Sequence, residues 1–435
     1  MSLGGGSFIS QNKVLPGAYI NFVSAASASA TLSDRGVVTM PLELDWGVEG
    51  EIFEVGVDDF QKNSMKYFGY PYTHDKMKGL RDLFKYAKTL YAYKLNSGGT
   101  KASCDFATAK YPGSRGNALK IVIQANVDDP SMFDCYTYMD NVAVDLQTVS
   151  AAANLVDNDY VEFKKNASLL VTASTPLTGG ATGTVPGQAY QSYFDKIESY
   201  RFNTMGVVTT ENTVKGLAAS FVKRMRDDVG VKFQLVLYDY KSADYMGVIS
   251  VKNEAIGSTS KADLVYWVTG AQAGCAVNKS LQNKQYDGEY TMNVDFTQSE
   301  LVKAIQAGEF TFHNVNGIPR VLDDINTKVS VSDTEGNVFK DNQTVRVIDQ
   351  IGNDIAVLFA NKYLGAVPND ATGRVSLWSD IVKHHKDLQS IRAIEDFEDS
   401  DVVISPGDTK KAVAVQDAVT VVNAMSKLYM TTVIS

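Results

Sequence analysis

The stretch NTVKGLAASFVKRMRDDVGVKFQLVLY, residues 212–238, places a helix pattern directly before a hydrophobic segment. In its first part, Asn212–Val229, apolar residues recur at intervals of three and four, which is typical of an amphipathic helix. These positions are Val214, Leu217, Ala218, Phe221, Val222 and Met225. The last part, Phe233–Tyr238, lacks alternation of polar and apolar residues, which is typical of a strand buried on both faces of a parallel sheet. A helix that leads into such a strand indicates an α/β fold.

The same alternation of strands and helices continues on both sides of this stretch. The predicted strands are Ala18–Ser24, Val37–Leu44, Leu90–Leu95, Thr204–Thr209 and Val248–Val251. The predicted helices are Asp58–Tyr67 (with Asp58 or Asp59 as its cap), His74–Leu90, Tyr190–Ser199 and Lys261–Gly274. Such alternation predicts helices that cover a mostly parallel sheet.

Between about residues 96 and 183 the pattern changes to short strands and polar turns. The predicted strands are Asn117–Gln124, Phe133–Met139, Val142–Val149, Tyr160–Lys164 and Leu169–Ala173. This spacing predicts a small antiparallel sandwich. Glycine-rich segments border it at 97–99 and 178–187, and two flexible borders indicate a domain inserted into the α/β region. The second border lacks the Gly-Lys-Ser/Thr of a phosphate-binding loop, so we interpret it as a linker.

The C-terminal part mixes helices and strands. The predicted helices are Thr297–Ala307 (with Ser299 as a possible cap), Asn342–Leu364 and Leu377–Ser390, and strand-like segments are Glu309–Val315, Pro319–Leu322 and Lys411–Val422. The last segment, Met425–Ile434, alternates like a strand and has no element after it. A strand in that position pairs either with its own sheet or with a neighbour's.

Bulk composition excludes several classes of function. The 435 residues carry a formal net charge of −9, which argues against nucleic acid or an anionic membrane as the main partner. The three cysteines are far apart, so neither a disulfide framework nor a Cys-x-x-Cys metal site is expected. No stretch is apolar enough to span a membrane, and 18–30 lacks the charge pattern of a signal peptide.

The sequence offers no convincing catalytic, cofactor-binding or metal-binding residues. Adjacent histidines at 384 and 385, with Asp380 four residues before, form the best metal candidate. Adjacent helical residues point about 100° apart and cannot act as i, i+4 ligands do. We therefore interpret Lys383, His384, His385 and Lys386 as a basic, partly solvated helix face. No Gly-x-Ser-x-Gly elbow is present, and the acidic run 395–401 is typical of a solvated surface.

A family resemblance comes from the segment GGGSFISQNKVLPGAYINFVS, residues 4–24. It resembles the start of tail sheath proteins from contractile phages and phage-like bacteriocins of Gram-positive bacteria. Further similar segments are Gly36-Val37-Val38, Pro41 to Trp46-Gly47, Gly206 onward, and Leu322–Asn326 with the helix that follows it. The resemblance extends over essentially the whole chain in order.

The resemblance implies an α/β and α+β multidomain architecture. It places an α/β core of subtilisin-like fold at 19–94 and 187–308, and an inserted antiparallel β-sandwich, exposed outside, at 95–186. A C-terminal α+β domain facing the tail tube would occupy 309–422. Extended arms that exchange between subunits would be 1–18 and 423–435. The residues alone also allow a frayed terminus at 1–15, because a glycine lead followed by an extendable segment fits both interpretations.

The resemblance also implies a structural function without cofactor. Subunits would polymerise as six-fold rings of a helical sheath around a tail tube protein, with baseplate and tail terminator proteins as further partners, and contract to drive the tube through a target envelope. Assembly would occur in the bacterial host cytoplasm. The implied exchange-strand residues are Phe8, Ile9, Gln11, Lys13, Val14, Leu428, Tyr429, Met430, Thr431 and Val433. From the local positive charge of Leu377–Ser390 in an acidic chain, we predict that Lys383, His384 and Lys386 face the tube.

Two other functions remain as alternatives. A hydrolase of subtilisin-like or related α/β type would need a clustered Ser/His/Asp set. A surface-layer or adhesive protein would need a signal peptide.

Overall fold

The computed structural model describes residues 32–333 and 335–434. The predicted N-terminal arm and the strand expected at Ala18–Ser24 lie outside these residues. The chain divides into two compact units, which are described separately. Among the described residues, the first comprises 34–352 with 421–434, and the second comprises Asn353–Thr420 with 32–33. The fold is mixed α/β and multidomain, as the sequence predicts.

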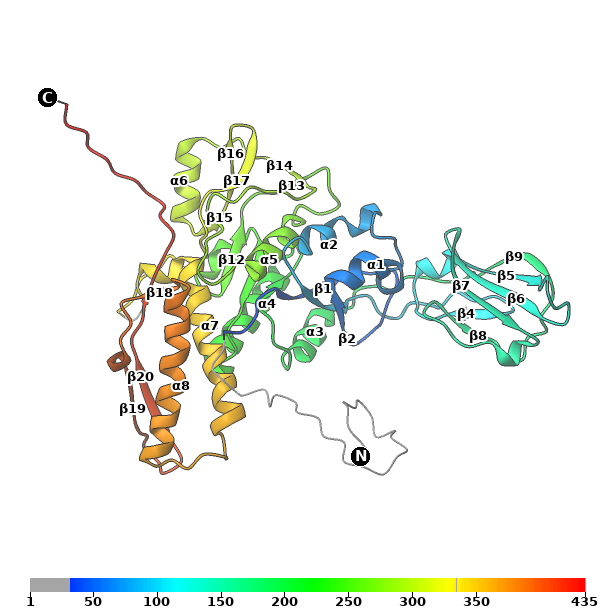
Figure 1. Cartoon of the computed structure of the whole chain (residues 1–435). Helices are drawn as coiled ribbons and strands as arrows, with labels where there is room; N and C mark the ends of the chain where they lie inside the picture. Colours follow the sequence, from blue (N-terminus) through cyan, green and yellow to red (C-terminus); the bar gives the residue numbers. More distant parts are fainter. Residues whose placement is uncertain (1–31, 334, 435) are drawn as a thin grey trace. The chain divides into compact units, whose positions relative to one another are not determined.

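A seven-stranded sheet organises the first unit, in the order β15-β12-β11-β10-β1-β3-β2 (Figure 1). Its strands are β1 (Val37–Leu42), β2 (Ile52–Gly56), β3 (Thr89–Lys94), β10 (Thr204–Gly206), β11 (Gln234–Tyr238), β12 (Val248–Val251) and β15 (Glu309–Phe310). All neighbouring pairs are parallel except β2 with β3. The strand β15 forms one edge of this sheet, and the second compact unit begins at Asn353. The domain border expected between residues 308 and 309 stays a prediction.

Helices cover both faces of the sheet. One hydrophobic cluster packs against α1 (Val57–Phe68), α2 (Lys78–Leu83) and α5 (Leu264–Gly274), and the other against α3 (Ala189–Ile197) and α4 (Asn212–Arg224). In β11, Val236 belongs to the first cluster, whereas Leu235 and Leu237 belong to the second. This two-sided burial explains why the strand lacks polar alternation, and it confirms the prediction from residues 233–238.

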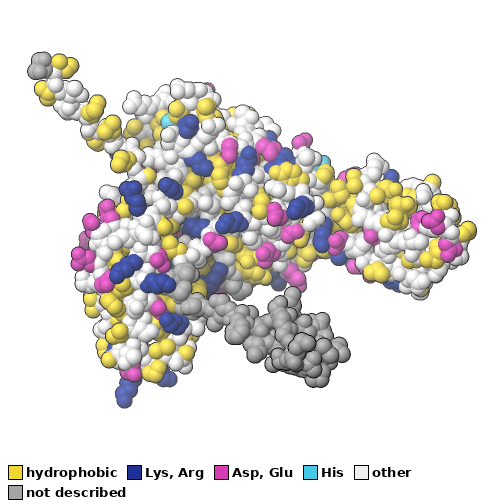
Figure 2. All heavy atoms as spheres, in the orientation of Figure 1, with side chains coloured by type: hydrophobic (Ala, Val, Ile, Leu, Met, Phe, Trp, Pro, Cys, Tyr) yellow, Lys and Arg dark blue, Asp and Glu magenta, His cyan; other side chains and the backbone are white. Residues whose placement is uncertain are grey.

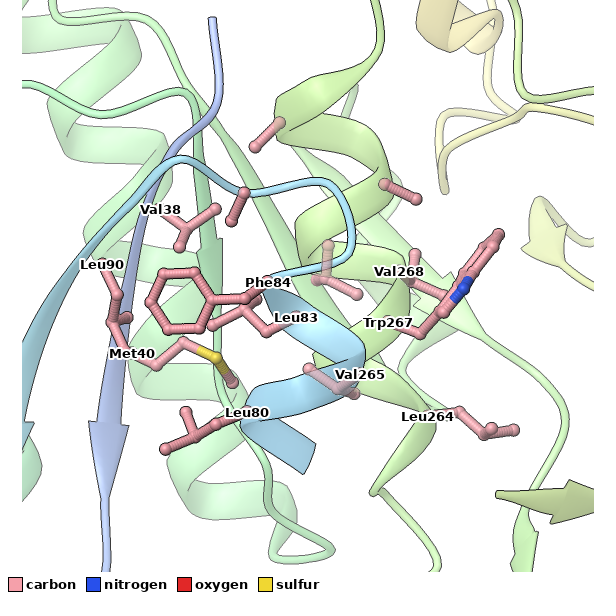
Figure 3. Close-up of a cluster of buried hydrophobic side chains, with 14 of the residues drawn as sticks. Val38, Met40, Leu80, Leu83, Phe84, Leu90, Leu264, Val265, Trp267 and Val268 are labelled. Carbon is pink, nitrogen blue, oxygen red and sulfur yellow. The ribbon is translucent and has the colours of Figure 1, made fainter. Parts of the chain in front are cut away.

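The pair of helices α2 and α5 is packed so closely that only glycine fits between them. A Cβ on Gly270 of α5 would overlap the carbonyl oxygen of Leu83. Figure 3 shows the surrounding cluster, in which Met40 of β1 and Val268 of α5 take part.

The helix predicted over His74–Leu90 is much shorter. A 3-10 turn at Asp75–Met77 precedes α2, which ends at Leu83. Backbone pairing competes with the helical pattern beyond that point: the Lys88 N–H donates to the Gly36 carbonyl at 2.7 Å, and Thr89 already pairs with β1. Tertiary strand pairing thus overrides local helix periodicity.

Two helix caps also differ from the predictions. Gly56 is the N-cap of α1, without a side-chain cap, and Asp58 and Asp59 lie in the first turn, where negative charge favours the helix dipole. Thr297, not Ser299, caps α6 (Gln298–Gln306), through a capping box with Glu300.

The inserted region forms two antiparallel sheets. The larger has the order β7-β6-β5-β9 and the smaller pairs β4 with β8. Their bounds are β4 (Ala107–Ala109), β5 (Leu119–Ala125), β6 (Phe133–Met139), β7 (Val142–Val149), β8 (Val161–Phe163) and β9 (Thr172–Pro176). The entering and leaving chains pair at Ser97↔Thr184 and Thr100↔Ala181. A Cβ on Gly183 would overlap the Ser97 carbonyl oxygen, so this glycine-rich border is a close backbone pairing as well as a linker.

Two short hairpins complete the first unit: β13 (Ala255–Ile256) with β14 (Thr291–Met292), and β16 (Phe312–Val315) with β17 (Ile318–Val321). The helix α7 (Asn342–Leu358) runs along the sequence from the first unit into the second and continues as a π-helical turn at Phe359–Tyr363. The later elements are α8 (Ala371–Ser390), β18 (Ile394–Glu395), β19 (Val402–Pro406), β20 (Val413–Asp417) and β21 (Thr420–Val421). The helix α8 begins six residues earlier than predicted, because the Asp370 side chain accepts from the Gly373 N–H at 2.8 Å.

Candidate assembly site

The C-terminal tail, residues 425–434, carries hydrophobic side chains that the chain does not bury. It has no regular secondary structure. The exposed fractions of its side chains include 86% for Leu428, 88% for Tyr429 and 88% for Val433. Figure 2 shows hydrophobic side chains along this extension. An exposed apolar segment as long as residues 425–434 marks an interaction surface.

The root of the tail is held by the first turns of α7. The Gln343 amide donates to the Val422 carbonyl at 2.9 Å and accepts from the Ala424 N–H at 3.0 Å. Thr344 and Asn423 also exchange side-chain hydrogen bonds. The tail therefore leaves the first unit from a fixed point.

The tail is expected to be a strand, yet within this chain it pairs with no strand in the described residues. Its composition nevertheless suits a strand. Leu428 and Met430 would point to one side, and Tyr429 and Val433 to the other. Apolar side chains on both sides are typical of a strand that becomes covered on both faces.

The second unit contains a sheet of only two strands. The strands β19 and β20 form an antiparallel pair in which Ile404 is opposite Val415. The Trp378 indole of α8 donates to the Val402 carbonyl at 2.9 Å, which fixes β19. Val415 in β20 is exposed. Because a two-stranded ribbon leaves unpaired backbone groups along its edges, it can accept a further strand.

The basic helix face on α8 is smaller than predicted. Lys383 and Lys386 are exposed, and Lys386 pairs with Asp399 at 2.6 Å. His384 and His385 are wholly buried, so neither can present its side chain to a partner. This corrects the inclusion of His384 in the predicted tube-facing set and the interpretation of both histidines as partly solvated.

The two histidines instead hold the second unit together. His384 Nε2 lies 3.0 Å from an Asp354 carboxylate oxygen, and His385 Nε2 lies 2.9 Å from one of Asp417 in β20. Their spacing could have indicated this: both continue the buried stripe that starts at Leu377, at the seventh and eighth positions after it.

The metal candidate at His384, His385 and Asp380 does not assemble. Asp380 accepts from Lys362 at 2.6 Å, whereas each histidine contacts a different carboxylate. Across residues 32–333 and 335–434, no three His, Cys, Asp or Glu side chains are grouped as a metal site would require.

A buried ion pair in the first unit is the strongest polar feature that the sequence did not reveal. Arg346 of α7 donates to Asp324 at 2.6 Å, and the side chains of both are 1% exposed. Gln272 of α5 and the Leu281 backbone N–H also donate to this carboxylate, at 2.8 and 2.9 Å. Burial disfavours the ionised carboxylate, but the Arg346 charge and these donors outweigh it and hold the pKa of Asp324 below its ordinary value.

An enzyme of this topology would use the cleft beyond the carboxyl ends of β1 and β10. The described residues that line it include Ser258, which donates to Asp263, but no histidine or cysteine. Two of the cysteines, Cys135 and Cys275, are buried elsewhere, and burial raises the pKa of both thiols, to about 11 for Cys135. A clustered Ser/His/Asp set is therefore not found in this cleft.

Comparison with known proteins agrees with this organisation. Four family models match consecutive parts of the chain: the Gp18 domain III N-terminal region of the tail sheath protein at 35–95, the phage tail sheath β-sandwich domain at 97–182, the central domain at 183–327 and the C-terminal domain at 334–435. The phage-like element PBSX protein XkdK of Bacillus subtilis is 31% identical across 98% of this chain and 99% of its own length. The chain belongs to the phage tail sheath family.

Solved structures agree with this assignment. The sheath tail protein of Desulfitobacterium hafniense is 37% identical, covers 95% of this chain and 99% of its own, and superposes with a TM-score of 0.81. The contracted helical sheath of the anti-feeding prophage shares the fold at 12% identity and a TM-score of 0.57, over 97% of this chain and 99% of its own. The protein is thus a subunit of a contractile tail sheath, and neither the hydrolase nor the surface-layer alternative is favoured.

The family is structural and does not constitute an enzyme class. None of the helices in the described part of the chain is both long and apolar enough to cross a membrane.

Proposed function

We propose that this sheath subunit polymerises by exchanging terminal strands with neighbouring copies, forms a helical sheath around a tail tube, and contracts to drive the tube through a target envelope. Rings would be six-fold, and the ends of the sheath would bind baseplate and tail terminator proteins. Assembly would take place in the cytoplasm of the bacterial host. One solved relative is the six-fold symmetrised baseplate of the anti-feeding prophage.

Two observations carry the proposal: the tail exposes apolar side chains, and the same chain contains a sheet of only two strands, β19 and β20. In the proposed sheath, residues 425–434 of one copy pair with the edge of β19–β20 in another. Main-chain hydrogen bonds would provide the attachment, and the alternating side chains would fix its register. About ten residues of extended chain reach roughly 30 Å, enough to connect two subunits.

The N-terminal arm would provide a second link of the same kind. Its assigned residues Phe8, Ile9, Gln11, Lys13 and Val14 lie outside the described residues, so this part rests on the family resemblance. Two links per subunit would let copies rotate and slide past one another while remaining attached.

Contact with the tube must be weak enough to break during contraction. Lys383 and Lys386 remain the proposed tube-facing residues, without His384. Exposed ion pairs contribute at most about 1 kcal/mol each, which suits a contact that must be released. The finer expectation of a subtilisin-like core also stays a prediction, and superposition of Asp34–Phe310 on that fold would test it.

Electron microscopy of the purified full-length chain tests the exchange mechanism. We expect hollow striated tubes from the intact protein and none after deletion of Met425–Ser435. A triple substitution of Leu428, Tyr429 and Met430 by serine should have the same effect without shortening the chain.

The matched control replaces exposed apolar residues elsewhere. Val127 and Val156 of the inserted domain are 93% and 68% exposed, and serine at both positions should leave the tubes intact. Tubes that persist in the deletion variant would refute tail exchange, while loss of tubes in the control would show that exposed apolar area in general drives assembly.

A further inference from the structure

A large open cleft lies at the carboxyl ends of the parallel strands in the first unit. Its volume is about 1140 Å³, and its lining includes the residues that follow β1, β3 and β10. From β1 the chain adds β3 on one side of the sheet, and later adds β10, β11 and β12 on the other, so the order reverses between β1 and β10. Ligands of open α/β sheets bind in the crevice at this reversal.

The lining of the cleft is acidic, with Glu43 and Glu211 exposed to solvent and Asp263 buried. Among the lining residues are five carboxylates and two lysines. Asp45 and Lys76 neutralise each other at 2.6 Å. Within the described part of the chain, no lysine or arginine forms an ion pair with Glu43, Glu211 or Asp263.

Tyrosines stand among these carboxylates. Burial, together with the charges of Glu43 and Glu211, raises the pKa of Tyr190 to about 12. Burial, followed by the charges of Asp263 and Glu43, also raises the pKa of Tyr266. The charge of Glu43 acts on both phenol groups, whereas Glu211 acts on Tyr190 and Asp263 acts on Tyr266, and all five residues line the cleft. Negative potential and aromatic surface therefore coincide there.

At the rim of the cleft, two tyrosine rings already bind lysine cations of this chain. Lys78 Nζ lies 4.7 Å from the centre of the Tyr290 ring, and Lys76 Nζ lies 4.9 Å from that of Tyr70. Both distances fall in the range of cation–π attraction. Within the described part of the chain, no lysine or arginine lies over the ring of Tyr190 or Tyr266 in this way.

We propose that this cleft binds an alkylammonium group between Tyr190, Tyr266 and the carboxylates of Glu43, Glu211 and Asp263. The ammonium would donate charge-assisted hydrogen bonds to the carboxylates, and its methylene stem would lie on the tyrosine rings. Two sources offer this group: a free polyamine, or a lysine side chain of another copy. The exposed turn Asp408–Lys411 carries two adjacent lysines and is the candidate segment in this chain.

Isothermal titration calorimetry with spermidine on the full-length protein at low ionic strength tests the site. We expect saturable binding that weakens with added salt, because partly exposed charges are screened. Replacement of Glu43 and Glu211 by glutamine should weaken binding roughly tenfold, as loss of two such ion pairs allows. Glu51→Gln with Glu54→Gln removes the same charge from exposed positions outside the cleft and should leave binding unchanged.

A second pair of variants separates the aromatic contribution from charge. Tyr190→Phe keeps the ring face and should retain binding, whereas Tyr190→Leu should weaken it; thermal unfolding of both checks that they are folded. No binding by the wild type, or equal weakening by the Glu51/Glu54 control, would overturn the proposal.

A peptide of residues 406–413 distinguishes the two sources. Competition between this peptide and spermidine would assign the cleft to a lysine of a neighbouring copy. Binding of spermidine with no effect of the peptide would assign it to a free polyamine. Either result supports an alkylammonium site.

Discussion

Replacing Asp324 by asparagine should remove much of the stability of the first unit. The carboxylate accepts from Arg346 at 2.6 Å, from Gln272 at 2.8 Å and from the Leu281 N–H at 2.9 Å. Asparagine retains one acceptor oxygen and turns an NH2 group toward donors. It also leaves the Arg346 guanidinium buried without a counterion.

The expected loss is about 3–5 kcal/mol in the free energy of unfolding, the range for breaking a buried pair from one side. Replacing Arg346 by methionine in the same variant should recover part of that loss, because removal of both charges leaves no uncompensated ion. Urea unfolding followed by tryptophan fluorescence measures this, since Trp46 and Trp267 are both buried in the first unit.

The pH dependence gives an independent check. The folded-state pKa of Asp324 is depressed, so its contribution is fully present above the unfolded value of about 3.9 and is lost as pH falls through the folded pKa. The stability gap between wild type and Asp324→Asn should therefore stay constant from about pH 7 to about pH 5 and narrow as the pH falls further toward about 3. A loss below about 1 kcal/mol, or a gap that does not change with pH, would refute the reasoning.

Two further substitutions test packing and assembly. Gly270→Ala should cost about 1–3 kcal/mol in unfolding free energy, despite the better helix propensity of alanine, because its Cβ overlaps the Leu83 carbonyl oxygen; an unchanged urea midpoint would contradict that close approach. Charge reversal of Lys383 and Lys386 to glutamate should weaken co-assembly with the tube in a sedimentation assay. The same change at Lys196, an exposed lysine on α3, should leave co-assembly unchanged. Equal co-assembly of the two variants would show that α8 does not contact the tube.

Strands with a clear local pattern of apolar residues could be predicted well. Phe133–Met139 and Val142–Val149 match β6 and β7 at both ends. Buried positions alternate along β6, and a tight turn joins it to β7, so no distant residue is needed to define the pair. The strand at Phe233–Tyr238 was equally clear because both of its faces are covered.

Features that depend on distant partners could not be predicted from local pattern. The helix expected to Leu90 ends at Leu83, because β1 pairs with the residues that follow. His384 was placed at the surface by its basic neighbours, although Asp354, thirty positions earlier, satisfies it inside the second unit. In each case the deciding interaction joins residues far apart in sequence. The local pattern of apolar residues carries no information about such contacts.

The difference in strength between buried and exposed ion pairs indicates how a sheath subunit could rearrange during contraction. Two buried ion pairs fasten α7 to the first unit: Arg346 with Asp324, and Arg226 with Asp349 at 2.6 and 2.7 Å. Breaking either from one side costs about 3–5 kcal/mol, several times the contribution of an exposed pair such as Lys386 with Asp399. A rearrangement that keeps the buried ion pairs and changes only the exposed ones therefore costs less free energy. On the proposed function, contraction then moves subunits as intact bodies, and the conformational change falls on the tail that begins after Ala424.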